Sequence, residues 1–224
     1  MMKLEPLEME VFKTDRWKKI VKLLPKNTSG LGLDIGAYWP MTKKIEKITG
    51  MKILQLNVEK SQVNYGCIGD AEKKLPFKNN CFDFVFLGET IEHIRNTDLL
   101  FEEIRRTLKK KGIGIITTPN LVSFFNRILF LLGKLPAGYH LSQRYIVDKP
   151  FIKNRKNPFK ERGHIKLFTV GALKELLQLY GFKILKIDGY YNSEPWRQLK
   201  VLRKLASFLP ITWREGIIVK FMKC

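Results

Sequence analysis

Two residues with ligand-binding chemistry lie at the end of one apolar segment near the start of the chain. The segment Leu31–Ile35 (LGLDI) is apolar apart from Asp34, as expected of a buried strand in a parallel sheet, and Gly36 follows it directly. Ligands of open parallel sheets bind outside the carboxyl ends of the strands. A glycine there lets backbone N–H groups approach a ligand, and the Asp34 carboxylate can orient a positively charged amine. The segment predicts a ligand site at a strand exit.

Histidines are the candidates for acid–base chemistry, because an unperturbed imidazole titrates near neutral pH. His93 follows the predicted strand 82–87, and His164 lies in a later loop where strand exits could meet. His140, beside Tyr139, is a weaker third candidate. The structural alternatives are a helix-start residue bonded to backbone for His93 and a packing role for His164. No nucleophile–base pair is visible in the sequence.

Strands and helices alternate along most of the chain. Helical spacing of apolar residues predicts a first helix that ends before Pro25, and Pro40 and Gly50 suit the start and end of a second. Further helices are predicted over 97–111 and from about Thr169. The predicted strands cover 31–35, 52–57, 65–68, 82–87, 113–118, 182–187 and 216–222. This alternation predicts an α/β protein with a doubly wound, mostly parallel seven-stranded sheet and helices on both faces.

The length of 224 residues suits one domain, 1–224, in which 120–166 breaks the alternation as an insert. Charge is the compositional outlier, with 41 Lys plus Arg against 21 Asp plus Glu and a net charge of +20. A basic protein of this kind attracts nucleic acid, anionic lipid or phosphorylated substrates. The alternative is a solvated lysine-rich surface without a partner.

The cysteines indicate a reducing compartment. Cys67, Cys81 and Cys224 are far apart, with no CxxC pair and no nearby histidine cluster to complete a metal site, so no metal is predicted. The first residues lack the apolar run of a signal peptide, and no stretch reaches the length of a membrane span. We therefore expect a cytoplasmic protein.

Four stretches in fixed order carry a family resemblance: LGLDIG, GDAEKKLPF, FDFVFLGETIEH and IRRTLKKKGIGIITTPN. Together they resemble the class I S-adenosylmethionine-dependent methyltransferases, in the type 11/23-like subgroup, over residues 31–120. The resemblance implies a Rossmann-like methyltransferase fold, S-adenosylmethionine as cofactor and methyl transfer as the reaction.

The resemblance also implies eight cofactor-binding residues at the strand exits: Asp34, Gly36, Ala37, Asn57, Asp70, Ala71, Gly88 and Glu89. The first three belong to the motif that holds the methionine end of the cofactor. Asn57 falls where the family usually has an acidic residue that binds both ribose hydroxyls. Asp70 and Ala71 match the pair that contacts adenine. The last two match the turn beside the methyl group.

Two departures from the family pattern bear on cofactor binding. Tyr38 and Trp39 stand where further glycines are common, so they either form an apolar wall over the cofactor or fill its place. Asn57 lacks the carboxylate that makes charge-assisted bonds to two hydroxyls, a loss of about 1 kcal/mol.

The insert 120–166 should face the acceptor. Its first part, 121–135, is apolar almost all round, and the following loop is basic. This pattern fits a small-molecule or lipid-linked acceptor with an apolar body and an anionic head, met at an anionic membrane surface by a peripheral protein. A basic amphipathic segment, 196–209, would add to the attraction of the protein to the anionic membrane surface. The alternative is that both are ordinary core helices with solvated lysine faces.

Two other functions stay open. Tyr139, Tyr145 and Phe151 among the cations of the insert would suit an RNA methyltransferase, although no separate RNA-binding module is visible. A non-catalytic binding or scaffold protein with the same fold would result if Tyr38 and Trp39 closed the cofactor site.

Overall fold

The computed structural model describes residues 12–60, 63–139, 141–142, 144–145, 147–148, 164–191 and 209–224. Seven strands form one sheet in the order β3-β2-β1-β4-β5-β7-β6. The first five strands pair in parallel, and β7 runs antiparallel to both of its neighbours. The predicted α/β class and mostly parallel seven-stranded sheet are confirmed.

The strands lie close to their predicted positions, except that β5 begins at Leu108 and not at residue 113. Their bounds are β1 Leu31–Ile35, β2 Lys52–Asn57, β3 Gly66–Ile68, β4 Phe82–Gly88, β5 Leu108–Pro119, β6 Phe182–Tyr190 and β7 Gly216–Lys223. The central strands β1 and β4 are buried along almost their whole length, as expected of parallel strands covered on both faces.

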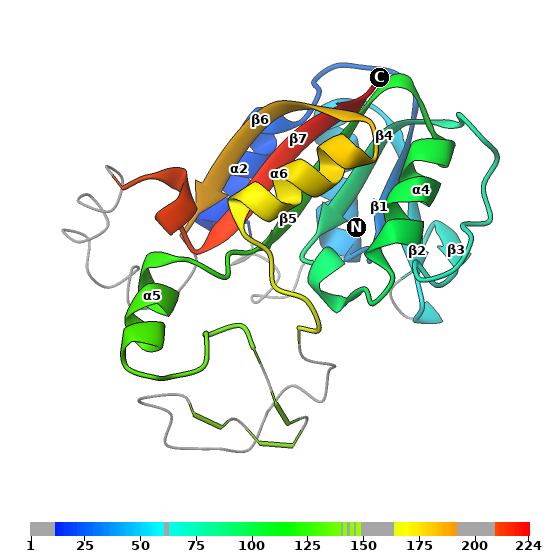
Figure 1. Cartoon of the computed structure of the whole chain (residues 1–224). Helices are drawn as coiled ribbons and strands as arrows, with labels where there is room; N and C mark the ends of the chain where they lie inside the picture. Colours follow the sequence, from blue (N-terminus) through cyan, green and yellow to red (C-terminus); the bar gives the residue numbers. More distant parts are fainter. Residues whose placement is uncertain are drawn as a thin grey trace.

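Helices cover both faces of the sheet (Figure 1). Helices α4 (Thr97–Thr107) and α6 (Val170–Leu179) pack on one face. Helices α2 (Asp15–Leu23) and α3 (Trp39–Thr49) pack on the other. The sheet therefore divides the apolar core into two layers.

Local sequence signals fix the ends of these helices. Thr14 caps α2 by accepting a hydrogen bond from the Trp17 N–H at 3.2 Å, and Thr169 caps α6 in the same way. Gly50 ends α3 in the left-handed conformation, with a φ of 80°. The ends at Thr169 and Gly50 agree with the sequence prediction.

The predicted helix over 97–111 ends earlier than expected, at Thr107. Leu108 is already extended, pairs with Phe82 of β4 and buries its side chain completely. Strand pairing and core burial at Leu108 therefore outweigh the helix signals of the basic run that follows it. Residues 108–111, the end of the predicted helix, belong to β5, and Lys109 forms an ion pair with Asp83 at 2.8 Å.

Beyond β5 lie the short helix α5 (Phe124–Leu131) and, near the end of the chain, the 3-10 helix η3 (Ile211–Trp213). A second 3-10 helix, η2 (Ile91–His93), follows β4. In the described part of the chain, none of the helices has the length and apolar content that crossing a membrane requires.

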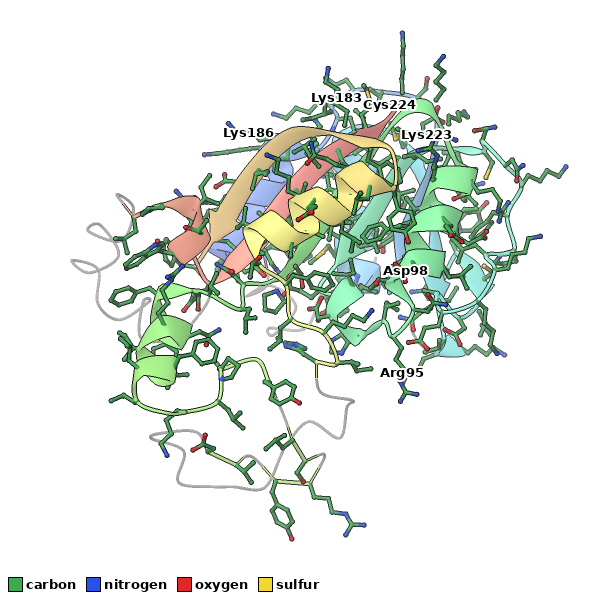
Figure 2. The ribbon with its side chains drawn as sticks, viewed as in Figure 1. Arg95, Asp98, Lys183, Lys186, Lys223 and Cys224 are labelled. Atoms are coloured by element: carbon green, nitrogen blue, oxygen red, sulfur yellow. The ribbon has the colours of Figure 1, made fainter. Side chains whose placement is uncertain are left out.

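Part of the positive charge lies along the edge strand β6. Lys183 and Lys186 of β6 are exposed, and Figure 2 shows them with Lys223 at the upper side of the molecule, away from α5. Lysines on an edge strand discourage pairing with other chains. These charges therefore have a structural explanation that needs no anionic partner.

Phe221 should be a main contributor to the stability of the β5–β7 pair. It lies opposite Gly114, stacks edge-on against Phe182 with ring centroids 4.8 Å apart, and is fully buried. We expect Phe221→Ala to lower the free energy of unfolding by about 3–5 kcal/mol in chemical denaturation. The neighbouring half-buried residue gives the control Met222→Ala, which should cost much less. Equal losses in the two variants would contradict this assignment of the core.

Candidate active site at the exits of β1 and β4

A cavity of about 190 Å³ opens at the carboxyl ends of β1 and β4. Its lining residues come from α2, α3 and the two strand exits: Arg16, Asp34, Gly36, Tyr38, Met41, Phe86, Gly88 and Glu89. Half of the eight predicted cofactor residues are among them. The predicted ligand site at these strand exits thus coincides with a hollow in the structure.

Gly36 makes the turn after β1 possible. Its φ of +72° is left-handed, and a Cβ atom there would lie 2.4 Å from the Thr90 hydroxyl. The Gly36 N–H donates to the Leu56 carbonyl at 2.9 Å, so this amide is bonded to the end of β2. The glycine is required by backbone conformation and by close packing of two strand exits.

Asp34 supplies a buried carboxyl beside the cavity. The Thr42 hydroxyl donates to its Oδ2 at 2.5 Å, and the Gln55 amide donates to the Thr42 hydroxyl at 3.2 Å. Burial raises the pKa of Asp34 to about 7, although the Thr42 hydrogen bond opposes the shift. A cation bound in the cavity would stabilise the ionised form, in agreement with the predicted role of orienting an amine.

Glu89 holds a second carboxylate at the cavity wall. Its backbone is left-handed, with a φ of 56°, and its Oε1 accepts hydrogen bonds from the Thr117 hydroxyl at 2.7 Å and the Tyr190 hydroxyl at 2.8 Å. Arg16 of α2 approaches the same oxygen at 3.4 Å. Burial, followed by the charge of Glu89, raises the pKa of Tyr190 well above its usual value, so Tyr190 stays a donor.

Arg16 is the functional candidate that sequence reasoning missed. It lies in the first turn of an amphipathic helix, where a surface cation is ordinary, and only the packing of α2 against the sheet brings it to the strand exits. Arg16 supplies a guanidinium to the cavity lining and Asp34 and Glu89 supply carboxyl groups, so the cavity presents both basic and acidic groups.

The residues fit the amino-acid end of S-adenosylmethionine. That end carries a carboxylate, which Arg16 can bind, and an ammonium group, which Asp34 and Glu89 can bind. The cavity volume of about 190 Å³ is smaller than the roughly 300 Å³ at which pockets for complete drug-sized ligands begin. The cavity therefore suits the amino-acid end of the cofactor.

The remaining predicted cofactor residues lie outside this cavity. Asn57 donates to the Ala37 carbonyl at 3.1 Å and accepts from the Glu59 N–H at 3.2 Å, so its side chain ties the end of β2 to the turn after β1. Asp70 accepts from the Glu72 N–H at 2.9 Å. Ala71 is buried in the core. Their proposed contacts with ribose and adenine stay predictions.

The two rings beside the turn leave the hollow open. Tyr38 is 37% exposed and lines the cavity, as the predicted apolar wall requires. Trp39 begins α3, is not among the lining residues, and has the Lys43 ammonium over its ring at 4.9 Å.

The structure brings the two candidate bases together. The rings of His93 and His164 lie edge to face with centroids 5.0 Å apart. Beside them Glu92, which sequence reasoning missed, is buried and accepts from the Thr118 hydroxyl at 3.0 Å. Burial and the nearby charge of Glu89 raise the pKa of Glu92 to about 8. The third candidate, His140, lies outside the described residues.

Comparison with known proteins identifies the domain type. Residues 9–116 match the family model described as a methyltransferase domain. No curated protein matches the sequence.

Among solved structures, an S-adenosylmethionine-dependent methyltransferase from Mesorhizobium loti is similar at 13% identity and a TM-score of 0.62, covering 93% of this chain and 98% of that one. One from Archaeoglobus fulgidus has 16% identity and a TM-score of 0.60, covering 96% and 94%. The [4+2]-cyclase SpnF has 17% identity and a TM-score of 0.58, covering 93% and 81%. At these identities the likeness shows the fold alone.

The raised pKa of Asp34 predicts a pH-dependent loss of stability. Below pH 4 the carboxyl is protonated in both states, and between pH 4 and 7 only the folded protein keeps the proton. The Asp34 contribution to the free energy of unfolding therefore falls by roughly 2 to 3 kcal/mol from pH 5 to pH 8. We expect Asp34→Asn, followed by denaturation at several pH values, to remove this dependence. The exposed Asp98→Asn should keep it, and identical slopes in the wild type and Asp34→Asn would refute the assignment.

Proposed function

We propose that this chain, a class I S-adenosylmethionine-dependent methyltransferase, methylates a small-molecule or lipid-linked acceptor that has an apolar body and an anionic head. When bound, the cofactor supplies an electrophilic methyl group on a sulfonium. Its displacement needs alignment more than acid–base help. Arg16, Asp34 and Glu89 hold the amino-acid end, and the exit of β4 sets the position from which the acceptor is reached.

One observation carries the choice of acceptor: the insert after β5 exposes apolar side chains at the edge of the sheet that holds the cavity. Leu131 is 87% exposed and Leu132 is 65% exposed, at the end of α5. Figure 1 shows α5 beyond the carboxyl end of β5. Exposed leucines on adjacent positions favour an apolar partner over solvent.

The insert is anchored at that edge by polar contacts. Asn120 donates through its side-chain amide to the carbonyls of Thr212 and Arg214, both at 2.8 Å. Farther along, Tyr139 pairs with His164 in an isolated parallel bridge. The insert therefore runs from the end of β5 past the histidine pair, which suits a cover over the acceptor.

The anionic head of the proposed acceptor is inferred from the basic residues of the chain. Within the described part of the insert, Lys134 forms an ion pair with Asp148 at 2.9 Å, and Arg127 lies over the ring of Trp213 at 5.0 Å. The basic residues of 149–163 and residues 196–208 of the basic amphipathic segment lie outside the described residues. Their charge within the total of +20 supports attraction to an anionic head or an anionic membrane surface.

The role of Arg16 can be tested by binding alone. We expect Arg16→Ala to weaken binding of S-adenosylhomocysteine about tenfold or more in calorimetry, because a charge-assisted bond to the cofactor carboxylate is lost. Arg95→Ala is the matched control, since Arg95 is exposed and points away from the molecule in Figure 2. Unchanged affinity in Arg16→Ala would remove Arg16 from the site. No binding by the wild type would favour a scaffold protein.

The apolar turn of α5 can be tested on membranes. We expect the wild type to be retained on phosphatidylglycerol vesicles in a salt-sensitive manner, and Leu131→Glu with Leu132→Glu to reduce retention at least several-fold while S-adenosylhomocysteine binding is kept. Leu179→Glu on α6 is the control, because Leu179 is 77% exposed but lies on another element. Retention on RNA and not on vesicles would contradict the lipid proposal and favour an RNA acceptor.

A further inference from the structure

Three side chains at and beside η2 form a potential ligand set for a metal ion. Glu92, His93 and His164 each offer one ligand atom, and these atoms all lie within 4.8 Å of one another. Two of the residues are consecutive on η2. The third is held against η2 by its chain neighbours, since the N–H groups of Ile165 and Lys166 donate to the Glu92 carbonyl at 2.8 and 3.0 Å. The grouping is therefore fixed by backbone contacts.

A separate observation points to a cation as the ligand of this cluster. Glu92 is only 1% exposed, and while its Oε2 accepts from Thr118, its Oε1 is buried without a hydrogen-bond partner. A buried carboxyl oxygen without a hydrogen-bond partner is costly, and native proteins rarely leave one unsatisfied. A metal ion bound between Glu92 and the two imidazoles would satisfy it.

The donor set indicates the class of ion. Two imidazoles with one carboxylate suit borderline divalent ions such as Zn²⁺, Co²⁺, Fe²⁺ and Mn²⁺, and three protein ligands leave coordination positions open. Ligand atoms on a tetrahedral Zn²⁺ lie about 3.3 Å apart. His93 and His164 are both partly exposed, so their rings can move inward where the present separation is larger.

We propose that Glu92, His93 and His164 bind one divalent transition-metal ion whose open positions take an oxygen atom of the acceptor. This inference rests on the proposed function and gives the anionic head of the acceptor a specific binding group. It also assigns the two histidines as metal ligands in place of the general bases that their sequence positions predict.

The position of the ion relative to the cofactor follows from β5. Consecutive residues of this strand, Thr117 and Thr118, bond the two carboxylates of the η2 region, Glu89 on the cavity side and Glu92 on the histidine side. Because neighbouring strand residues point to opposite faces of a sheet, the Thr117 and Thr118 hydroxyls leave β5 on opposite faces. Glu92 and His93 belong to η2, which directly follows β4, so an acceptor oxygen held by the ion would lie beside the exit of β4.

The experiment uses the full chain, free of affinity tag and metal, without cofactor or acceptor. Calorimetric titration with Zn²⁺, and visible absorption with Co²⁺, should show one ion per chain bound by nitrogen and oxygen ligands. We expect Glu92→Gln, which keeps the size of the side chain, and His164→Ala each to weaken Zn²⁺ binding at least about tenfold. Glu175→Gln is the control, because Glu175 is exposed on α6.

The outcomes separate this proposal from the function on which it rests. Each variant is also titrated with S-adenosylhomocysteine, and retained binding shows that the fold and the cofactor site are intact. A folded wild type that binds S-adenosylhomocysteine but no Zn²⁺ would overturn the metal site and leave the histidines as bases. Zn²⁺ bound equally by wild type and variants, or thiolate absorption from Co²⁺ on cysteines, would overturn it as well.

Discussion

The contact between Gly36 and Thr90 holds the two strand exits of the site together. Gly36 adopts a left-handed conformation that leaves no room for a side chain, and the Thr90 hydroxyl that occupies this space donates to the Ile35 carbonyl at 3.1 Å. The exits of β1 and β4 are thereby packed against each other. Asp34 on one side and Glu89 on the other can line a single cavity only because of this packing.

The second structural feature is the way in which β5 divides the polar groups. Its consecutive threonines, Thr117 and Thr118, fix Glu89 toward Arg16 and Glu92 toward the histidines. Two carboxyl groups three positions apart are thus placed in different surroundings: Glu89 forms an ion pair with Arg16, and Glu92 is almost completely buried. The cationic amine of the cofactor would complement Glu89, and an acceptor oxygen bound through a metal ion would complement Glu92.

Much of the fold could be predicted from the sequence, because apolar runs and helix caps are local signals. Thr169 and Gly50 marked helix ends correctly. The predicted end of α4 was wrong because Leu108 is buried through its pairing with Phe82 of β4, and no local sequence pattern indicates that pairing. At the site, the predicted ends of β1 and β4 were enough to identify Asp34, Gly36, Gly88 and Glu89 as candidates.

Arg16 and Glu92 could not be predicted in the same way, since each becomes functional only through packing between distant elements. The family model and the similar structures establish a methyltransferase fold without indicating the acceptor, and the likeness to a cyclase shows that chemistry resides in the site. The acceptor is therefore argued from the insert and the charged groups of this chain.

The most direct test of the account is a crystal structure with S-adenosylhomocysteine. The account predicts the carboxylate of the ligand at Arg16, its amine near Asp34 and Glu89, and Tyr38 beside it as a wall. A ligand bound elsewhere, with the Arg16–Glu89 ion pair unchanged, would contradict it.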